Sequence, residues 1–358
     1  PQLEIDLVGE ERAKLATRPE HLGIRRHEVE QIVLGTDRQQ LAELALFADG
    51  VRFLTERTGI PVLGVLPFLR DLALDQEDSL DVDIRRQVAF QRDCINLAVI
   101  LLPHMSNFTD FNALAGEPDV ALRYAATPEE AAGADAILLP GSKTTLADLA
   151  YLRGKGFESL LHGHVHRGGE VVGICGGYQM LGRRIADPDA VESGGSGEGL
   201  GLLQVTTVLM REKITEQVEG RALYLGGPAA PPVRGYLIHM GRTDRHGHRA
   251  CFELQGKEPS PAGPRDVTER DDAWLDGAMS DDGLVWGTYI HGLFDEPLCR
   301  RAWLNRLRIR KGLPAADMAL SQQVNRQRSG AMDRWADHVE QHLDLTPILA
   351  LLRHGGTV

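Results

Sequence analysis

Cysteine is scarce in this sequence. The four cysteines, at positions 94, 175, 251 and 299, are scattered without Cys-x-x-Cys spacing. This distribution argues against both a zinc site and a disulfide scaffold, so we expect no metal site. It also indicates a reducing cytoplasm as the compartment.

The sequence also lacks an excess of basic residues and any long apolar run. Its formal net charge of −12 argues against nonspecific binding to nucleic acid. No apolar run approaches the length of a membrane-spanning helix, and the N-terminal residues show no signal-peptide pattern, so we expect no membrane association. A length of 358 residues with 42% hydrophobic content is typical of a globular protein of two domains.

The sequence also lacks a phosphate-binding glycine loop. The pattern Gly-x-x-x-x-Gly-Lys-Ser/Thr, whose backbone N–H groups cradle nucleotide phosphates, occurs nowhere in the sequence. We therefore expect this chain to bind neither ATP nor any other cofactor.

The sequence does contain an alternation of short apolar runs and helical patterns. Buried strands are predicted at 95–102, 136–139, 171–174 and 284–290, and helices at 146–153, 157–166 and 296–311. This alternation predicts an α/β fold with a doubly wound, mostly parallel sheet. A partial α/β segment, with a helix at 46–58 and a strand at 62–66, precedes it.

The middle of the chain is less regular. The glycine-rich stretch 194–201 is interpreted as a loop, and short strands are predicted at 204–210, 222–225 and 235–241. Residues 71–83 are acidic and predicted to be a loop at a domain boundary, and 259–272 are predicted to be an exposed loop. Helices are predicted near 332–342 and 347–352.

Cys175 stands at the most informative position in the sequence. It follows the apolar run 171–174, precedes Gly176 and Gly177, and is followed by a helical pattern. A nucleophile on such a strand–turn–helix is exposed, and flanking glycines let a substrate approach the backbone closely. The first N–H groups of the helix can stabilise a thiolate or an oxyanion. The alternative is a buried structural cysteine.

A cysteine nucleophile needs a base, and His291 at the end of the strand 284–290 is the best candidate. Gly141, in a Pro-Gly turn after the strand 136–139, is a candidate second oxyanion donor, although an ordinary β–α turn would look the same. Further candidates for contact with the substrate are Gly176, Gly177, Gln179 and His239. His239 could equally be a core histidine with its hydrogen bonds satisfied.

Two weaker patterns point to simpler interpretations. The histidines at 162, 164 and 166 do not share one face of a helix, which argues against a metal cluster. The basic run 300–311 could face an acidic ligand or a partner domain, but a solvated helix face is the favoured interpretation.

Five ordered segments resemble a known family, the glutamine amidotransferase half of cobyric acid synthase, in the group shared with cobyrinic acid a,c-diamide synthase. The segments are 106–111 (SNFTDF), 139–149 (LPGSKTTLADL), 173–182 (GICGGYQMLG), 235–243 (GYLIHMGRT) and 287–294 (GTYIHGLF). The resemblance implies a flavodoxin-like fold of the class I glutamine amidotransferases. It also implies glutamine hydrolysis through a thiolate acyl-enzyme, with Cys175 as nucleophile and His291 as base. The ammonia would pass to ATP-activated carboxylates of a corrinoid, adenosylcobyrinic acid a,c-diamide.

The resemblance also implies a domain organisation. Residues 91–310 correspond to the amidotransferase domain, residues 1–90 to a remnant of the ATP-dependent synthetase domain and a linker, and residues 311–358 to a C-terminal helical extension. Within the remnant, 64–67 and 77–79 carry the likeness, whereas 1–44 do not match. The complete enzyme would use ATP and magnesium, so a separate or missing ATP-binding domain is an expected partner.

One departure concerns the histidine. Many cysteine amidotransferases carry a Glu two residues after it, and this chain has Leu293 there, which fits a family that uses a Cys/His pair. The identity of any third residue stays open. Two alternatives remain: a stand-alone glutaminase subunit of another ligase, and a non-catalytic binding module with the same fold.

Overall fold

The computed structural model describes residues 37–67, 69, 86–226, 229–255 and 273–353. The chain divides into two compact units, residues 75–326 and residues 1–74 with 327–358. The boundary falls within the helix α10 (Met318–His342). Much of the expected synthetase remnant, including 77–79, and the expected loops 71–83 and 259–272 lie wholly or largely outside the described residues. No helix in the described ranges is long and apolar enough to cross a membrane.

The larger unit is built on a six-stranded sheet in the order β13-β14-β6-β4-β1-β3. The strands are β1 (Ile95–Ile100), β3 (Val120–Ala125), β4 (Ala136–Leu139), β6 (Glu170–Ile174), β13 (Ala278–Met279) and β14 (Val285–Thr288). All neighbouring pairs are parallel except β13–β14. The predicted α/β fold with a mostly parallel sheet is thus confirmed. Every residue of β1, β4, β6 and β14 is buried, which explains why these strands appear in the sequence as continuous apolar runs.

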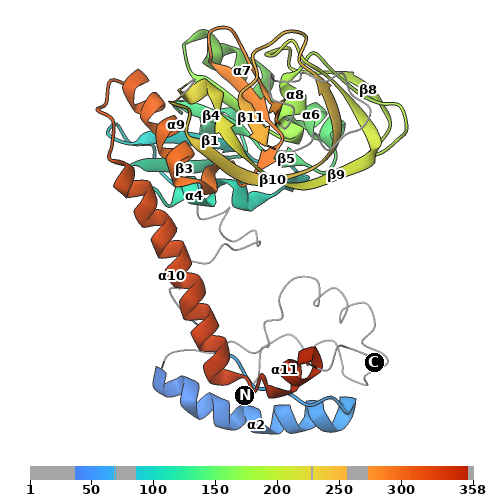
Figure 1. Cartoon of the computed structure of the whole chain (residues 1–358), viewed down its shortest axis with the longest axis vertical. Coiled ribbons are helices and arrows are strands. Elements are labelled where there is room, and N and C mark those ends of the chain that lie inside the picture. Colours follow the sequence, from blue (N-terminus) through green and yellow to red (C-terminus); the bar gives the residue numbers. More distant parts are fainter. Residues whose placement is uncertain (1–36, 68, 70–85, 227–228, 256–272, 354–358) are drawn as a thin grey trace. The chain divides into compact units, whose positions relative to one another are not determined.

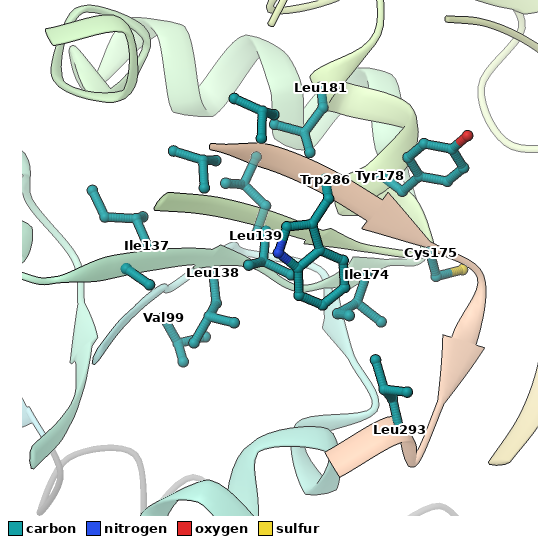
Figure 2. Packing of buried hydrophobic residues seen from close by; sticks show 14 of the residues in the cluster. Val99, Ile137, Leu138, Leu139, Ile174, Cys175, Tyr178, Leu181, Trp286 and Leu293 are labelled. Carbon is teal, nitrogen blue, oxygen red and sulfur yellow. The ribbon is translucent and has the colours of Figure 1, made fainter. Parts of the chain in front are cut away.

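Helices lie between or after these strands in the chain. They are α4 (Asn112–Ala115), α5 (Pro128–Ala131), α6 (Thr145–Gly154), α7 (Phe157–His166), α8 (Gly176–Leu181) and α9 (Pro297–Arg310). Figure 2 shows the apolar cluster that they form with the strands, with Val99, Leu138 and Trp286 in its interior and Cys175 where the strand ends. The site therefore lies at the edge of a closely packed core, which holds its backbone in place.

A second, mostly antiparallel sheet was not predicted from the sequence. Its main path is β12-β11-β9-β10-β15, and β7 and β8 pair beside β9. The strands are β7 (Arg184–Asp187), β8 (Gly195–Glu198), β9 (Thr206–Ala222), β10 (Pro232–Asp244), β11 (Phe252–Gln255), β12 (Ala273–Asp276) and β15 (Ile290–His291). Figure 1 shows β9 and β10 as long strands running side by side.

Several local predictions in this region were wrong. The expected loop 194–201 contains strand β8, and the expected strand at 222–225 is mostly a 3-10 turn, η4 (Leu223–Leu225). The strand expected at 204–210 is present as the start of β9, which continues to Ala222. The pairing with β10 keeps the polar middle of β9 extended, although its sequence does not alternate clearly. The expected strand 284–290 is also divided, because the chain leaves β14 in the first sheet and enters β15 in the second.

The smaller unit contains α2 (Asp37–Thr58), the C-terminal part of α10, and α11 (Thr346–Arg353). The expected strand 62–66 is reduced to an isolated bridge between Gly64 and Leu343. The N–H of Asp344 donates to the carbonyl of Leu63 at 2.7 Å beside it. This unit therefore joins a segment near the start of the described chain to its C-terminal helices.

Candidate active site

Cys175 lies between β6 and α8 in a strained backbone conformation. Its φ and ψ are 51° and −109°, which is unusual for a residue with a side chain. Its N–H donates to the carbonyl of Thr288 in β14 at 2.8 Å, and its carbonyl accepts from the N–H of Gln179 at 3.1 Å. The residue is only 8% exposed, so the expectation that this turn holds the cysteine exposed was wrong. The strand–turn–helix predicted around this residue is present, and the hydrogen bonds on both sides hold the turn in place.

The glycines after Cys175 are required by close packing. A Cβ on Gly176 would lie 2.8 Å from the backbone nitrogen of Ser142, and one on Gly177 would lie 2.1 Å from the carbonyl oxygen of Leu139. The start of α8 therefore rests directly on the backbone that follows β4. Residues with side chains at these positions would push the cysteine turn away from its neighbour.

His291 is buried and paired with an aspartate. Its Nδ1 lies 2.7 Å from Oδ2 of Asp110, and the other carboxylate oxygen accepts from the N–H of Gly292 at 2.8 Å. Burial on its own lowers the pKa of His291, but hydrogen bonds with Asp110 and Cys175, together with their negative charges, raise it to about 10. The carboxylate of Asp110 therefore favours the protonated form of the imidazole.

Asp110 comes from a distant segment of the chain. It belongs to the 3-10 helix η3 (Phe108–Phe111), 181 residues before His291. The sequence offered one signal for it, because 106–111 is a polar segment that follows the carboxyl end of the strand at 95–100. Ends of neighbouring parallel strands meet at one edge of a sheet, so an acid in that segment was a candidate that the sequence analysis missed.

Gly141 lies beside the imidazole. It begins β5 (Gly141–Ser142), which pairs with β2 (Met105–Ser106). A Cβ on Gly141 would lie 2.7 Å from Oγ of Ser106 and 3.4 Å from Cε1 of His291. The structure thus brings Gly141 to the histidine, while Gly176, next to Cys175, packs on Ser142 of the same short strand.

Both ends of the Gln179 side-chain amide are hydrogen-bonded to other side chains of the protein. Its side-chain oxygen accepts from the hydroxyl of Thr145 at 3.2 Å, and its side-chain nitrogen donates to the hydroxyl of Tyr289 at 3.3 Å. The residue is 3% exposed. These contacts tie α8 to α6 and to the segment between β14 and β15.

His239 lies on the other side of the same tyrosine. Its ring stacks on Tyr289 with centroids 3.8 Å apart, and its Nδ1 lies 2.8 Å from the carbonyl oxygen of Gly241. Burial lowers the pKa of His239 to about 4, so the ring is neutral near pH 7. It lines a cavity together with Gly241, Thr243 and Tyr289.

The weaker patterns of the sequence have structural explanations. His162 and His164 each direct Nε2 to a backbone carbonyl oxygen, of Leu200 and Glu170 respectively. The interpretation of the basic run as a solvated helix face was wrong for its first members, because Arg300 and Arg301 are fully buried and paired with Glu117. A carboxylate on a neighbouring segment compensates these charges, which the sequence pattern alone does not reveal.

The sequence of this chain matches a known protein family. The CobB/CobQ-like glutamine amidotransferase domain matches residues 96–298. A cobyric acid synthase of Citrobacter koseri is 42% identical over 320 residues, covering 87% of this chain and 59% of that protein. One from Nostoc punctiforme is 40% identical over 308 residues, covering 86% and 59%. The chain thus spans about three fifths of the length of these relatives.

The solved structures that match this chain have low sequence identity and low TM-scores. A structure titled PurLQS from Thermotoga maritima is 15% identical and covers 66% of this chain and 98% of that chain, with a TM-score of 0.40. A crystal structure of a glutamine amidotransferase is 16% identical and covers 61% and 99%, with a TM-score of 0.38.

Proposed function

The chain belongs to the CobB/CobQ-like glutamine amidotransferase domain family, and on that premise we propose that it hydrolyses glutamine at Cys175. One observation carries the proposal: a cysteine on a strained turn lies against a buried His–Asp pair. The Cys175 sulfur would attack the side-chain amide carbon of glutamine and form a tetrahedral intermediate. Cleavage of the C–N bond would release ammonia and leave a thioester, which water would then hydrolyse to glutamate.

His291 moves the protons of this cycle. Because it is cationic beside the thiol, it stabilises the thiolate and can give a proton to the departing ammonia. The neutral imidazole then takes a proton from the water that attacks the thioester. The backbone N–H groups of Gly141, Gly176 and Gly177 are the proposed donors to the oxyanion, supported by the position of Gly141 beside the imidazole and of Gly176 next to the nucleophile.

Gln179 and His239 receive different roles. We propose that Gln179 supports the site by linking α8 to Tyr289, since both ends of its amide are engaged. His239 would line the substrate site as an uncharged side chain, because its low pKa keeps the imidazole neutral near pH 7.

The wider reaction is that of a cobyric acid synthase. The relatives with that name support delivery of the ammonia to corrinoid carboxylates activated by ATP and magnesium. In this proposal residues 91–310 act as the amidotransferase domain, 1–90 as part of a synthetase domain with its linker, and 311–358 as a C-terminal extension. The ATP site would lie in a region of the relatives that this chain does not match. Four free cysteines, with Cys94 partly exposed, support a reducing cytoplasm as its location.

Release of glutamate and ammonia from glutamine is the direct test. The unchanged protein and a Cys94→Ala variant should both hydrolyse glutamine, whereas Cys175→Ala should not, with circular dichroism showing an intact fold in all three. Equal activity in Cys175→Ala would contradict the proposal. Turnover of glutamine without amidation of adenosylcobyrinic acid a,c-diamide, even when a synthetase domain, ATP and magnesium are added, would favour a glutaminase that serves another ligase. Absence of turnover under those conditions would favour a non-catalytic module.

A further inference from the structure

We propose that Asp110 is the positioning residue of the Cys175/His291 pair, and that the segment 106–111 holds the imidazole in its working orientation. The inference rests on the proposed glutaminase function. The position two residues after the histidine does not supply this group, because Leu293 is 1% exposed and packs in the apolar core (Figure 2). The carboxylate that contacts His291 comes instead from a segment far earlier in the chain.

Both carboxylate oxygens of Asp110 contact the segment that contains His291 and Gly292. One lies 2.7 Å from Nδ1 of His291, and the other accepts the N–H of Gly292 at 2.8 Å. A carboxylate accepts hydrogen bonds, so Nδ1 carries a proton in this contact. Nε2 is then the nitrogen that exchanges a proton with the thiol and the substrate. The two bonds fix the ring and the backbone that follows it.

Residues 106–111 also restrain the face of the His291 imidazole, through Tyr236. Tyr236 stacks on His291 with centroids 5.4 Å apart and 24° between the planes. Its hydroxyl accepts a hydrogen bond of 2.7 Å from Nδ2 of Asn107. Asn107 has a left-handed backbone with φ of 55°, a conformation with a modest cost for a residue other than glycine. Asn107 and Asp110 therefore restrain the imidazole from its face and from its edge.

The charge of Asp110 supports each proton transfer. While the sulfur is a thiolate, the carboxylate stabilises the imidazolium beside it. When the tetrahedral intermediate collapses, the C–N bond breaks and the proton on Nε2 moves to the departing nitrogen. In the second half, a water proton moves to Nε2 as the water oxygen bonds to the thioester carbon. Asp110 contacts His291 and Gly292 and acts on the reacting atoms only through the imidazole, which distinguishes it from the catalytic residues.

Three other titratable groups lie near His291: Tyr236 and His239, which stay neutral between about pH 5 and 9, and Asp295, whose carboxylate lies beside Gly292. Burial and the charge of Asp110 raise the pKa of Tyr236, and burial lowers the pKa of His239 to about 4. A pH profile of Cys175 reactivity over this range therefore reports on the pair and on Asp110.

The test measures two properties of the full chain, in the unchanged protein and in Asp110→Asn, Asp110→Glu and Asp187→Asn. The first is the rate of Cys175 alkylation by iodoacetamide against pH, and the second is kcat and KM for glutamine. Asp187 is the matched control, because it is a buried aspartate that accepts backbone N–H groups of Val191, Glu192 and Gly194.

For Asp110→Asn we expect kcat to fall about a hundredfold, the usual scale for impaired acid–base catalysis, with KM changed less than about threefold. The upper limb of the alkylation profile, where His291 loses its proton, should move down by about one pH unit or more, because the imidazolium loses its anionic partner. Asp110→Glu should recover part of both properties, and Asp187→Asn should change neither.

A fall in kcat without a shift in the alkylation profile would overturn the proposal, because it would indicate a structural role only. Unchanged kcat in Asp110→Asn would overturn it as well. If the unchanged protein fails to hydrolyse glutamine, the proposed function fails, but the alkylation profiles still decide whether Asp110 controls the Cys/His pair.

Discussion

At the scale of single residues, the four cysteines differ in their surroundings. Cys251 and Cys299 are fully buried, and burial raises the pKa of each thiol, so neither forms a thiolate near neutral pH. Cys94 is partly exposed, and its sulfur contacts the side-chain oxygen of Gln91 at 3.5 Å. Cys175 differs from the other three because it lies near His291, whose pKa is raised.

We therefore predict that a glutamine-like electrophile, such as a diazo ketone analogue of glutamine, labels Cys175 first. Peptide mapping by mass spectrometry should find the label on Cys175 well before Cys94, Cys251 or Cys299 react. Iodoacetamide added after denaturation provides the control, since it should label all four. Preferential labelling of Cys94 would contradict the assignment of the nucleophile.

The two histidines near the site should differ in their effect on turnover. We predict that His291→Ala lowers kcat for glutamine hydrolysis by at least about a hundredfold, the scale expected for loss of a general acid–base group. KM should change little, because the imidazole transfers protons and does not hold the amino acid. His239→Ala is the comparison and should retain much more activity, since its ring is neutral and stacked on Tyr289. The opposite ranking in steady-state kinetics would move the base to His239.

At the scale of elements, the cysteine turn depends on the contact between α8 and the end of β4. Gly177 lies so close to the Leu139 carbonyl that a methyl group cannot enter without displacing one of the two. The geometry of the cysteine turn therefore depends on a backbone-to-backbone contact, which only glycine permits.

We predict that Gly177→Ala destabilises the protein by at least about 2 kcal/mol, a typical cost of overpacking, and strongly lowers glutaminase activity. Gly154→Ala is the matched control, because Gly154 ends α6 with nothing within 4 Å of an added Cβ. That variant should be neutral or slightly more stable, as alanine favours helices over glycine. Urea unfolding followed by circular dichroism measures both, and equal midpoints for the two variants would refute the argument.

At the scale of the whole chain, the site for glutamine and the site for ATP are expected to be separable. The cysteine, the histidine and Asp110 all lie within residues 96–298, which match the amidotransferase family. The phosphate-binding glycine pattern is missing from the sequence, and the chain spans about three fifths of the matched relatives.

We predict that this chain shows no heat of binding when it is titrated with Mg-ATP, while it still hydrolyses glutamine. Amidation of the corrinoid should require an added nucleotide-binding synthetase domain. A full-length relative titrated in the same way should give a binding signal. Micromolar affinity of this chain for ATP, or amide formation by it alone, would reveal a nucleotide site that the sequence pattern does not disclose.

The sequence by itself determined the features that arise from neighbouring residues. Continuous apolar runs identified the strands of the parallel sheet, and the order of strand, cysteine, two glycines and helix identified the turn at Cys175. Five ordered segments were enough to recognise the family. These features follow from local backbone preference and from burial on both faces of a sheet. Each of these two causes produces a recognisable pattern of residue types along the sequence.

Only the tertiary structure decided which distant groups meet. Asp110 pairs with His291 across 181 positions, Arg301 is buried against Glu117, and polar residues of β9 are held in one long strand by β10. The chain also passes from the first sheet to the second between Thr288 and Ile290, which places His291 in the second sheet. Such contacts depend on the closure of long loops and on the register of the strands. The charge or hydrogen bond of a distant partner does not change the local sequence pattern around either residue.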